Sequence, residues 1–317
     1  MLINFIKQCI IIYMKLFKNR ILPGFIFLTL MLVIMIPMAI YGPTNFEARI
    51  ASYVFSACAF IVLCYEYFKA HHIKWYVNFL FILVILPTVI FPIKNFNELI
   101  IFSLKTKREW HSFFIENIAR DWFTLLILLG VSIAFTFVEF AERNNMSLED
   151  RFVRAITMMI SLYLIIISIK TIQLTLILKW EYTILIFAIP TCCDIFGYLG
   201  GSVAGKKWIK QPFAPTISPK KTWEGFIFAI LFGISTGLGL ILGFKLLNNN
   251  IFAQITASIF MPVFAILGDL YFSYIKRINA IKDYSKILLS HGGVLDRFDS
   301  VSFSTFFFLI SYVIFGL

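Results

Sequence analysis

Charge is scarce in this chain. Only 14% of its 317 residues are Asp, Glu, Lys or Arg, whereas 60% are hydrophobic and 18% are aromatic. Soluble domains carry charge on roughly a quarter of their residues, so most of this chain has no surface that faces water. A membrane-spanning helix needs about 20 apolar residues, and the length is sufficient for many of them. The composition therefore excludes a soluble domain and predicts one membrane domain.

Cysteine is also sparse, and its five positions lack the spacing of a zinc site or of a disulfide framework. Acidic residues number 17 against 28 Lys and Arg, which gives a net charge of +11. The basic residues lie in loops between apolar runs, so their excess indicates a membrane surface and anionic lipid or nucleotide ligands. Nucleic acid is not an expected partner.

Long apolar runs make up most of the chain. Backbone polar groups cannot remain unpaired in hydrocarbon, so each run of spanning length is expected to be helical. The predicted fold class is an all-α polytopic membrane protein with about nine transmembrane helices. The nine runs are 21–41, 50–68, 74–93, 122–139, 155–178, 183–201, 223–245, 252–275 and 298–316.

The loop charges predict an orientation. With the amino terminus in the cytoplasm, the cytoplasmic loops hold 19 of the 28 Lys and Arg residues and the opposite loops hold 8. An odd number of spans then places the carboxyl terminus on the opposite side. The expected localisation is multi-pass integral membrane, the inner membrane if the source is bacterial, with the active site facing the cytoplasm.

The expected organisation has three parts. A basic arm, 1–20, precedes a transmembrane region of about five helices, 21–180, and the arm is expected to be retained because no cleavage site follows it. A catalytic transmembrane region of about four helices, 181–317, carries the basic cytoplasmic loops 202–222 and 276–297. The mixed-charge segment 94–121 is interpreted as an amphipathic surface piece without chemistry.

Charged residues inside the spans are the first functional candidates. Asp194, Asp269 and Lys170 lie within apolar runs. A carboxylate at the bilayer centre costs about 2.5–3.5 kcal/mol on insertion scales, so such residues are rare and usually functional. The alternative is a structural ion pair, such as Lys170 with Asp194.

Spacing adds residues to Asp269. Ser273, Lys276 and Arg277 follow it at i+4, i+7 and i+8, so all four share one face of a helix. An acid, a hydroxyl and two bases on one face predict a polar pocket at the membrane boundary. For Lys276 and Arg277 alone, ordinary anchoring at the cytoplasmic surface is an equal alternative.

The following loop is rich in acids and glycines. It contains Lys282-Asp283, then His291-Gly292-Gly293, then Asp296-Arg297 and Asp299. Paired glycines allow a tight turn or a close approach of the backbone to a ligand. Carboxylates gathered among bases suit a divalent metal with phosphate, because Mg²⁺ prefers one or two carboxylates plus substrate oxygens. Asp269 and Asp296 are expected to bracket one Mg²⁺, or two cations.

The other basic loop combines glycines with lysines. Gly200-Gly201 and Gly205 precede Lys206-Lys207, and the segment Ser218–Thr222 offers two hydroxyls and two ammonium groups before a helix. Backbone of this kind beside lysines, together with a helix amino terminus, suits a polyphosphate. The spacing of a Walker loop is absent.

The motif from Ser273 to Asp299 closely resembles that of the phosphatidate cytidylyltransferase (CDP-diacylglycerol synthase) family. It keeps Ser273, Lys276-Arg277, Lys282-Asp283, His291-Gly292-Gly293, Asp296-Arg297 and Asp299 at fixed spacing. The segment Asp194–Gly225, which ends in Ser218–Gly225, resembles a second family motif. The resemblance covers about 190–300, and the first 180 residues match only as a series of spans. Departures from the usual pattern are Leu289-Ser290, Ile195 and Ser202.

The resemblance implies cytidylyl transfer from CTP to phosphatidate, with Mg²⁺ as cofactor, a homodimer and access to membrane lipid. It implies that Asp269 and Asp296 bind metal, that bases hold phosphates, and that Asp283, His291 and Asp299 orient the loop or the nucleotide. The candidate catalytic residues are Asp269, Asp296, Lys276, Arg277, Lys282, Asp283, His291 and Asp299. The candidate substrate-binding residues are Asp194, Ser218, Lys220, Lys221, Thr222, Ser273, Gly292, Gly293 and Arg297.

Three alternatives stay open at this point. The lipid substrate could be another lipid phosphate, because acyl chains contact generic apolar residues. An ion-coupled transporter would use Asp194, Lys170 and Asp269 near the middle of the membrane. A family member without activity is disfavoured because Asp269 and Asp296 are both present.

Overall fold

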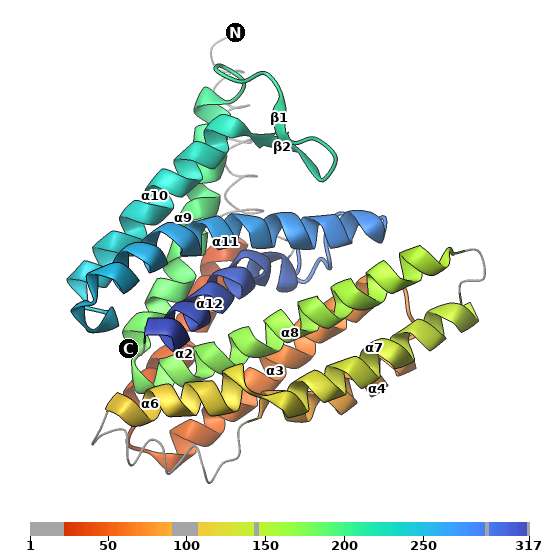
Figure 1. Cartoon of the computed structure of the whole chain (residues 1–317), viewed down its shortest axis with the longest axis horizontal. Coiled ribbons are helices and arrows are strands. Elements are labelled where there is room, and N and C mark those ends of the chain that lie inside the picture. The colour runs from red at the N-terminus through yellow and green to blue at the C-terminus, as the bar shows by residue number, and fades with distance from the viewer. Residues whose placement is uncertain (1–21, 91–106, 143–145, 289–291, 316–317) are drawn as a thin grey trace, which may run out of the picture.

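The part of the chain that the structure describes is almost entirely helical apart from one short hairpin (Figure 1). The computed structural model describes residues 22–90, 107–142, 146–288 and 292–315. The predicted arm, 1–20, and His291 lie outside the described residues. The elements are α2 (Leu22–Tyr41), α3 (Phe46–Ala70), α4 (Trp75–Ile85), η2 (Leu86–Val89), α6 (Lys107–Phe114), η3 (Ile115–Ala119), α7 (Trp122–Glu142), α8 (Leu148–Leu178), α9 (Trp180–Ala204), β1 (Pro212–Ala214), β2 (Ser218–Thr222), α10 (Trp223–Gly243), η4 (Leu247–Asn249), α11 (Ile251–Ile278) and α12 (Leu295–Phe315).

Polar residues mark the starts of three long helices. Ser147, Thr222 and Asn250 precede α8, α10 and α11, and the side chain of each accepts a backbone N–H from the first turn. These contacts satisfy donors that have no partner within the helix. The apolar runs that follow need no further partners in hydrocarbon, so the helices continue for 21 to 31 residues.

The predicted polytopic all-α membrane protein is confirmed in its main features. Within the described residues, seven helices are long and apolar enough to cross a membrane. Two shorter apolar helices, Thr29–Tyr41 and Trp75–Val89, coincide with the first and third predicted runs. The count of nine and the orientation of the termini stay predictions.

The segment 94–121 differs from its interpretation as a surface piece. In its described part, η3 packs against α8 and α6 packs against α12, where a ring nitrogen of His111 lies 3.0 Å from the carbonyl oxygen of Val313. The rings of Phe114 and Tyr312 lie 4.6 Å apart between centroids, and Phe114 is buried. The apolar side chains of this segment thus join the core, which local charge does not reveal.

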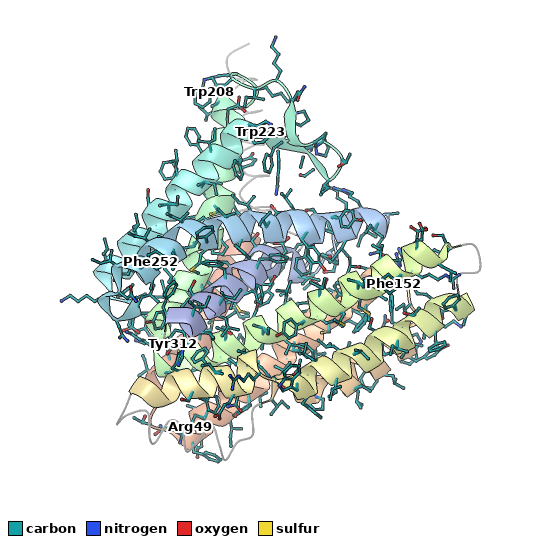
Figure 2. The ribbon with its side chains drawn as sticks, viewed as in Figure 1. Arg49, Phe152, Trp208, Trp223, Phe252 and Tyr312 are labelled. Atoms are coloured by element: carbon teal, nitrogen blue, oxygen red, sulfur yellow. The ribbon has the colours of Figure 1, made fainter. Side chains whose placement is uncertain are left out.

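A hairpin is the other departure from the helical expectation. β1 and β2 pair antiparallel within the predicted basic loop, between the end of α9 and the start of α10 (Figure 1). Trp208 and Trp223 lie at this end of the molecule, far from Tyr312 (Figure 2), and Trp208 is exposed.

The helices form two packed groups joined by α8. Buried side chains of α9 to α12 form one hydrophobic cluster with the second half of α8. Those of α3, α4, α7 and the first half of α8 form the other, which also receives the end of α11 and the start of α12. In Figure 1, α11 and α12 accordingly lie between the α9–α10 pair and the group of α8, α7, α3 and α4.

Candidate active site

Two ion pairs bring together residues that are distant in the sequence. Lys221 Nζ on β2 lies 2.5 Å from Asp269 Oδ2 on α11. Lys276 Nζ at the end of α11 lies 2.8 Å from Asp296 Oδ1 on α12. The two predicted motif segments therefore converge on α11, because the hairpin folds back over it and α12 begins beside its end.

Two more carboxylates and one more cation join these pairs. Lys276 Nζ lies 4.0 Å from Asp299 Oδ2. Asp194 on α9 interacts electrostatically with Asp269, Lys221 and Arg297. We define the charged cluster as Asp194, Lys221, Asp269, Lys276, Asp296, Arg297 and Asp299.

The spacing on α11 has the predicted consequence for three of its four polar residues. Ser273 Oγ donates to Asp269 Oδ1 at 3.2 Å, and Lys276 completes the same face toward Asp296. Arg277 is exposed and donates instead to two backbone carbonyls, those of Ile217 and Ile281, each at 3.2 Å. Arg277 thus ties the hairpin turn to the loop after α11.

The loop before α12 folds around Asp296. The Asp296 Oδ2 atom accepts the backbone N–H groups of Gly293 at 2.7 Å and Tyr284 at 3.0 Å. Gly292 adopts a φ of +82°, and a Cβ there would lie 2.7 Å from the same oxygen. Only glycine fits this position, on both conformation and space.

Tyr284 closes the inner side of this loop. Its hydroxyl donates to the carbonyl of Phe272 at 3.3 Å, and its ring centroid lies 5.4 Å from the Lys276 ammonium. Burial raises the pKa of the Tyr284 phenol well above its usual value, so this ring remains neutral beside the carboxylates.

The two lysines of β2 differ in exposure. Alternate strand residues face opposite sides, so Lys221 is partly buried against Asp269 whereas Lys220 is exposed. Thr222 uses its hydroxyl to cap α10, accepting Gly225 N–H at 3.1 Å. Ser218 begins the strand and is partly buried.

Two predicted residues form no hydrogen bond or ion pair with the charged cluster. Lys282 and Asp283 are exposed, and neither forms a hydrogen bond or ion pair with another described residue. His291 lies outside the described part of the chain. The suggested pairing of Lys170 with Asp194 is wrong, because Lys170 Nζ forms its ion pair with Asp121.

Comparisons with known proteins identify the family. The chain matches the cytidylyltransferase family over residues 2–315. It belongs to that family. A Mycoplasma pneumoniae protein is 37% identical over 196 residues, which are 48% of this chain and 48% of that protein. Proteins named phosphatidate cytidylyltransferase from Helicobacter pylori and Rickettsia bellii are 39% and 42% identical over 118 and 123 residues, each 37% of this chain. The matched parts are 42% and 51% of those two relatives, so the chain spans about half the length of the curated proteins it matches.

The donor set of this cytidylyltransferase-family member fits a hard divalent cation. Asp194 accepts no hydrogen bond from a described residue, and each Asp269 oxygen accepts one, from Ser273 or Lys221. A carboxylate oxygen has two lone pairs, so acceptor capacity remains at both residues. No group of three or more His, Cys, Asp or Glu converges as metal ligands within the described residues. Substrate phosphates and water would complete the shell, as is usual for Mg²⁺.

Asp296 has less free capacity than Asp269. Its Oδ2 atom already accepts two backbone N–H groups, and Oδ1 accepts the Lys276 ammonium. One lone pair of Oδ1 is left for a cation. The residue therefore serves the loop structure in addition to its expected metal role.

A buried acid that the sequence interpretation left without a role organises the other family motif. Glu224 Oε1 accepts the N–H groups of Trp208 at 2.8 Å and Ile209 at 3.0 Å, and Oε2 accepts that of Lys206 at 3.1 Å. Lys206 has a φ of +64°, a conformation that this carboxylate holds in place. An acid at the start of an apolar run was the available signal.

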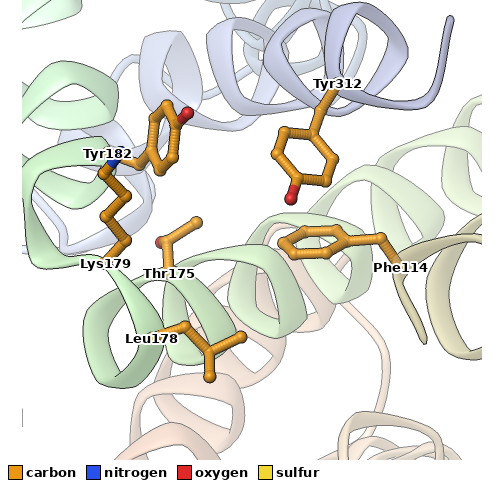
Figure 3. A pocket seen from close by; sticks show the side chains of 6 residues that line it. All are labelled: Phe114, Thr175, Leu178, Lys179, Tyr182 and Tyr312. Atoms are coloured by element: carbon orange, nitrogen blue, oxygen red, sulfur yellow. The ribbon is translucent and has the colours of Figure 1, made fainter. Parts of the chain in front are cut away.

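The pocket shown in Figure 3 is separate from the charged cluster. It is lined by Phe114, Thr175, Leu178, Lys179, Tyr182 and Tyr312. Tyr312 follows Asp296 by 16 positions on α12, which corresponds to about 24 Å at 1.5 Å per residue. The charged cluster, which lies between α9, β2, α11 and the start of α12, is therefore the candidate active site.

Proposed function

We propose that the protein is a phosphatidate cytidylyltransferase that faces the cytoplasm. The phosphate oxygen of phosphatidate attacks the α-phosphorus of CTP, the bond to the β-phosphate oxygen breaks, and CDP-diacylglycerol and pyrophosphate form. The observation that carries the proposal is the convergence of the two family motifs, in which the Lys221–Asp269 pair joins β2 to α11 and the Lys276–Asp296 pair joins the two ends of the motif from Ser273 to Asp299. The names of the relatives favour phosphatidate as the lipid.

The residues of the charged cluster fit this reaction by position and charge. Lys221, Lys276 and Arg297 supply three cations for a triphosphate and a lipid phosphate. Asp269 and Asp296 would hold Mg²⁺, and the bound cation would neutralise phosphate charge and orient the leaving pyrophosphate. The attacking phosphate is already ionised near neutral pH, so the site needs no general base. Catalysis is then a matter of orientation and of charges fixed before the reaction.

Placement in the membrane and assembly belong to the same proposal. The excess of Lys and Arg in the loops that carry the charged cluster supports a cytoplasmic active site. The family resemblance supports a homodimer, and the mass of the purified protein in detergent, corrected for bound detergent, tests it. A monomeric mass in active preparations would remove the dimer from the proposal.

The test is pyrophosphate release by the purified protein in mixed micelles that contain CTP and phosphatidate. We expect release that requires both phosphatidate and Mg²⁺ and that falls at least about a hundredfold in Asp296→Asn. Asp150→Asn is the matched control, because Asp150 is an exposed acid whose carboxylate accepts the Ser147 hydroxyl at the start of α8. Release with another lipid phosphate but not with phosphatidate would change the assigned substrate. No release with any lipid phosphate, from folded protein, would contradict the proposed function.

A further inference from the structure

A fully buried acid in the first transmembrane region contacts the loop that carries the catalytic motif. Glu66 lies on α3 with 0% of its surface exposed. Its Oε1 atom accepts the Ser285 hydroxyl at 2.5 Å and the Val294 N–H at 3.1 Å, and Oε2 accepts the Leu295 N–H at 2.7 Å. Among the described residues, no Lys, Arg or His forms an ion pair with Glu66.

The partners of Glu66 explain how a buried carboxylate is tolerated without a cation. α12 begins at Leu295, so the two backbone donors belong to its unsatisfied first turn. The positive end of the helix dipole also favours a negative group there. Glu66 therefore caps α12 from a helix that is more than 200 positions away in the sequence.

Each of the paired glycines lies against a different acid. A Cβ at Gly292 would lie 2.7 Å from Asp296 Oδ2, whereas a Cβ at Gly293 would lie 2.5 Å from Glu66 Oε2. Gly293 has no positive φ, so its position requires glycine because Glu66 approaches the backbone. One side of the loop is thus held by Asp296 and the other by Glu66.

We propose that Glu66 is a positioning residue for cytidylyl transfer. By holding Val294 and Leu295 it fixes the start of α12, and with it the direction in which Asp296 faces Lys276. Gly293, the neighbour of Val294, donates its N–H to Asp296 at 2.7 Å, so the two acids share one loop. The inference rests on the proposed function for its kinetic consequence, whereas the contact itself can be tested without any reaction.

The first experiment compares Glu66→Gln with the native chain by hydrogen exchange and by pyrophosphate release. Glutamine keeps the size but has one acceptor oxygen, so at least one N–H at the start of α12 loses its partner. We expect faster exchange at Val294 or Leu295, a fall in kcat of about tenfold or more, and a change in KM for CTP of less than about threefold. Native exchange at both amides together with native kcat would overturn the proposal.

The matched control is Glu139→Gln. Glu139 is another acid with about 2% of its side chain exposed, but its partner is Arg154 on α8 and it contacts no residue of the loop. We expect native exchange at Val294 and Leu295 and a native kcat per folded molecule. Equal effects in both variants would show general destabilisation and would overturn the positioning role.

A pair of variants tests the contact even if Glu66→Gln does not fold. Gly293→Ala places a methyl group against the Glu66 carboxylate and is expected to lower kcat about tenfold. Glu66→Asp withdraws the carboxylate by roughly 1.5 Å, the length of one C–C bond, so the double variant is expected to recover at least threefold over Gly293→Ala. No recovery would overturn the proposal. If even the native protein releases no pyrophosphate, the proposed function fails, while exchange at residues 294 and 295 still decides whether Glu66 holds the loop.

Discussion

Two ion pairs, one in each group of helices, differ in their exposure to solvent. In the amino-terminal group, Arg154 and Glu139 each expose only 2% of their side chains, whereas Lys221 and Asp269 in the carboxyl-terminal group each expose 28%. Breaking a buried pair costs about 3–5 kcal/mol, because one charge is left unpaired in a low dielectric. A partly exposed pair contributes about 1 kcal/mol or less, so a substrate phosphate or a cation can replace either partner at small cost.

This difference separates charges that maintain the fold from charges that are available to ligands. Arg154 also donates to Asn279 Oδ1 at 2.8 Å and so joins α8 to the end of α11. Lys170 and Asp121 likewise connect α8 to the segment after η3. These two pairs hold the helices around α8, whereas Lys221 and Asp269 stay partly exposed; the Lys276–Asp296 pair at the start of α12 exposes only 10% and 7% of its side chains.

The largest expected effect comes from breaking the buried pair. Arg154→Met leaves Glu139 buried without its cation and should lower the free energy of unfolding by about 3–5 kcal/mol. Thermal unfolding in detergent measures this loss, and pyrophosphate release per folded molecule should remain native. The variant Arg154→Met with Glu139→Met should recover most of the stability. A loss of turnover in the folded fraction would show that the buried Arg154–Glu139 pair affects the reaction as well as the stability of the fold.

The next largest effect is expected for the partly exposed Lys221–Asp269 pair, and it concerns turnover and not stability. Asp269→Asn removes a charge of the proposed cation site and should lower kcat by about a hundred- to a thousandfold. Because Asp269 is partly exposed, the same variant should change the free energy of unfolding by no more than about 1 kcal/mol. A large loss of stability with normal turnover would reverse the comparison and make Asp269 a structural residue.

A smaller loss is expected for the other partner of that pair. Lys221→Met removes one charge-assisted hydrogen bond to phosphate, worth about 1.5–3 kcal/mol, so kcat/KM should fall about ten- to a hundredfold. Steady-state rates over a range of CTP concentrations measure it. Unchanged kcat/KM would mean that Lys221 only neutralises Asp269 in the absence of substrate.

Local spacing was sufficient for the helices and for one face of α11. Runs of about 20 apolar residues have no alternative to helix in hydrocarbon, and the i, i+4, i+7 series predicted that Asp269, Ser273 and Lys276 lie together. The fixed spacing of the motif also led to the correct family.

Contacts between residues that are distant in the sequence could not be predicted from local spacing. Lys170 was given Asp194 as a partner, but it pairs with Asp121 from a segment interpreted as a surface piece. Glu66 and Glu139 lie inside or beside predicted spans, and the cost of a buried acid could have marked them. Only the packing of α3 against the start of α12 reveals what Glu66 holds.

The smallest expected effect concerns the other lysine of β2. The sequence interpretation assigned phosphate to both Lys220 and Lys221, but the alternation of the strand leaves Lys220 exposed and away from Asp269. Lys220→Met should therefore change kcat/KM by less than about threefold, as expected for an exposed substitution worth about 0.5 kcal/mol. The same steady-state assay, run beside Lys221→Met, measures the contrast. An equal loss in both variants would mean that the hairpin turns its outer face toward the triphosphate when CTP binds, so that exposure in the free protein would no longer identify the residues that contact substrate.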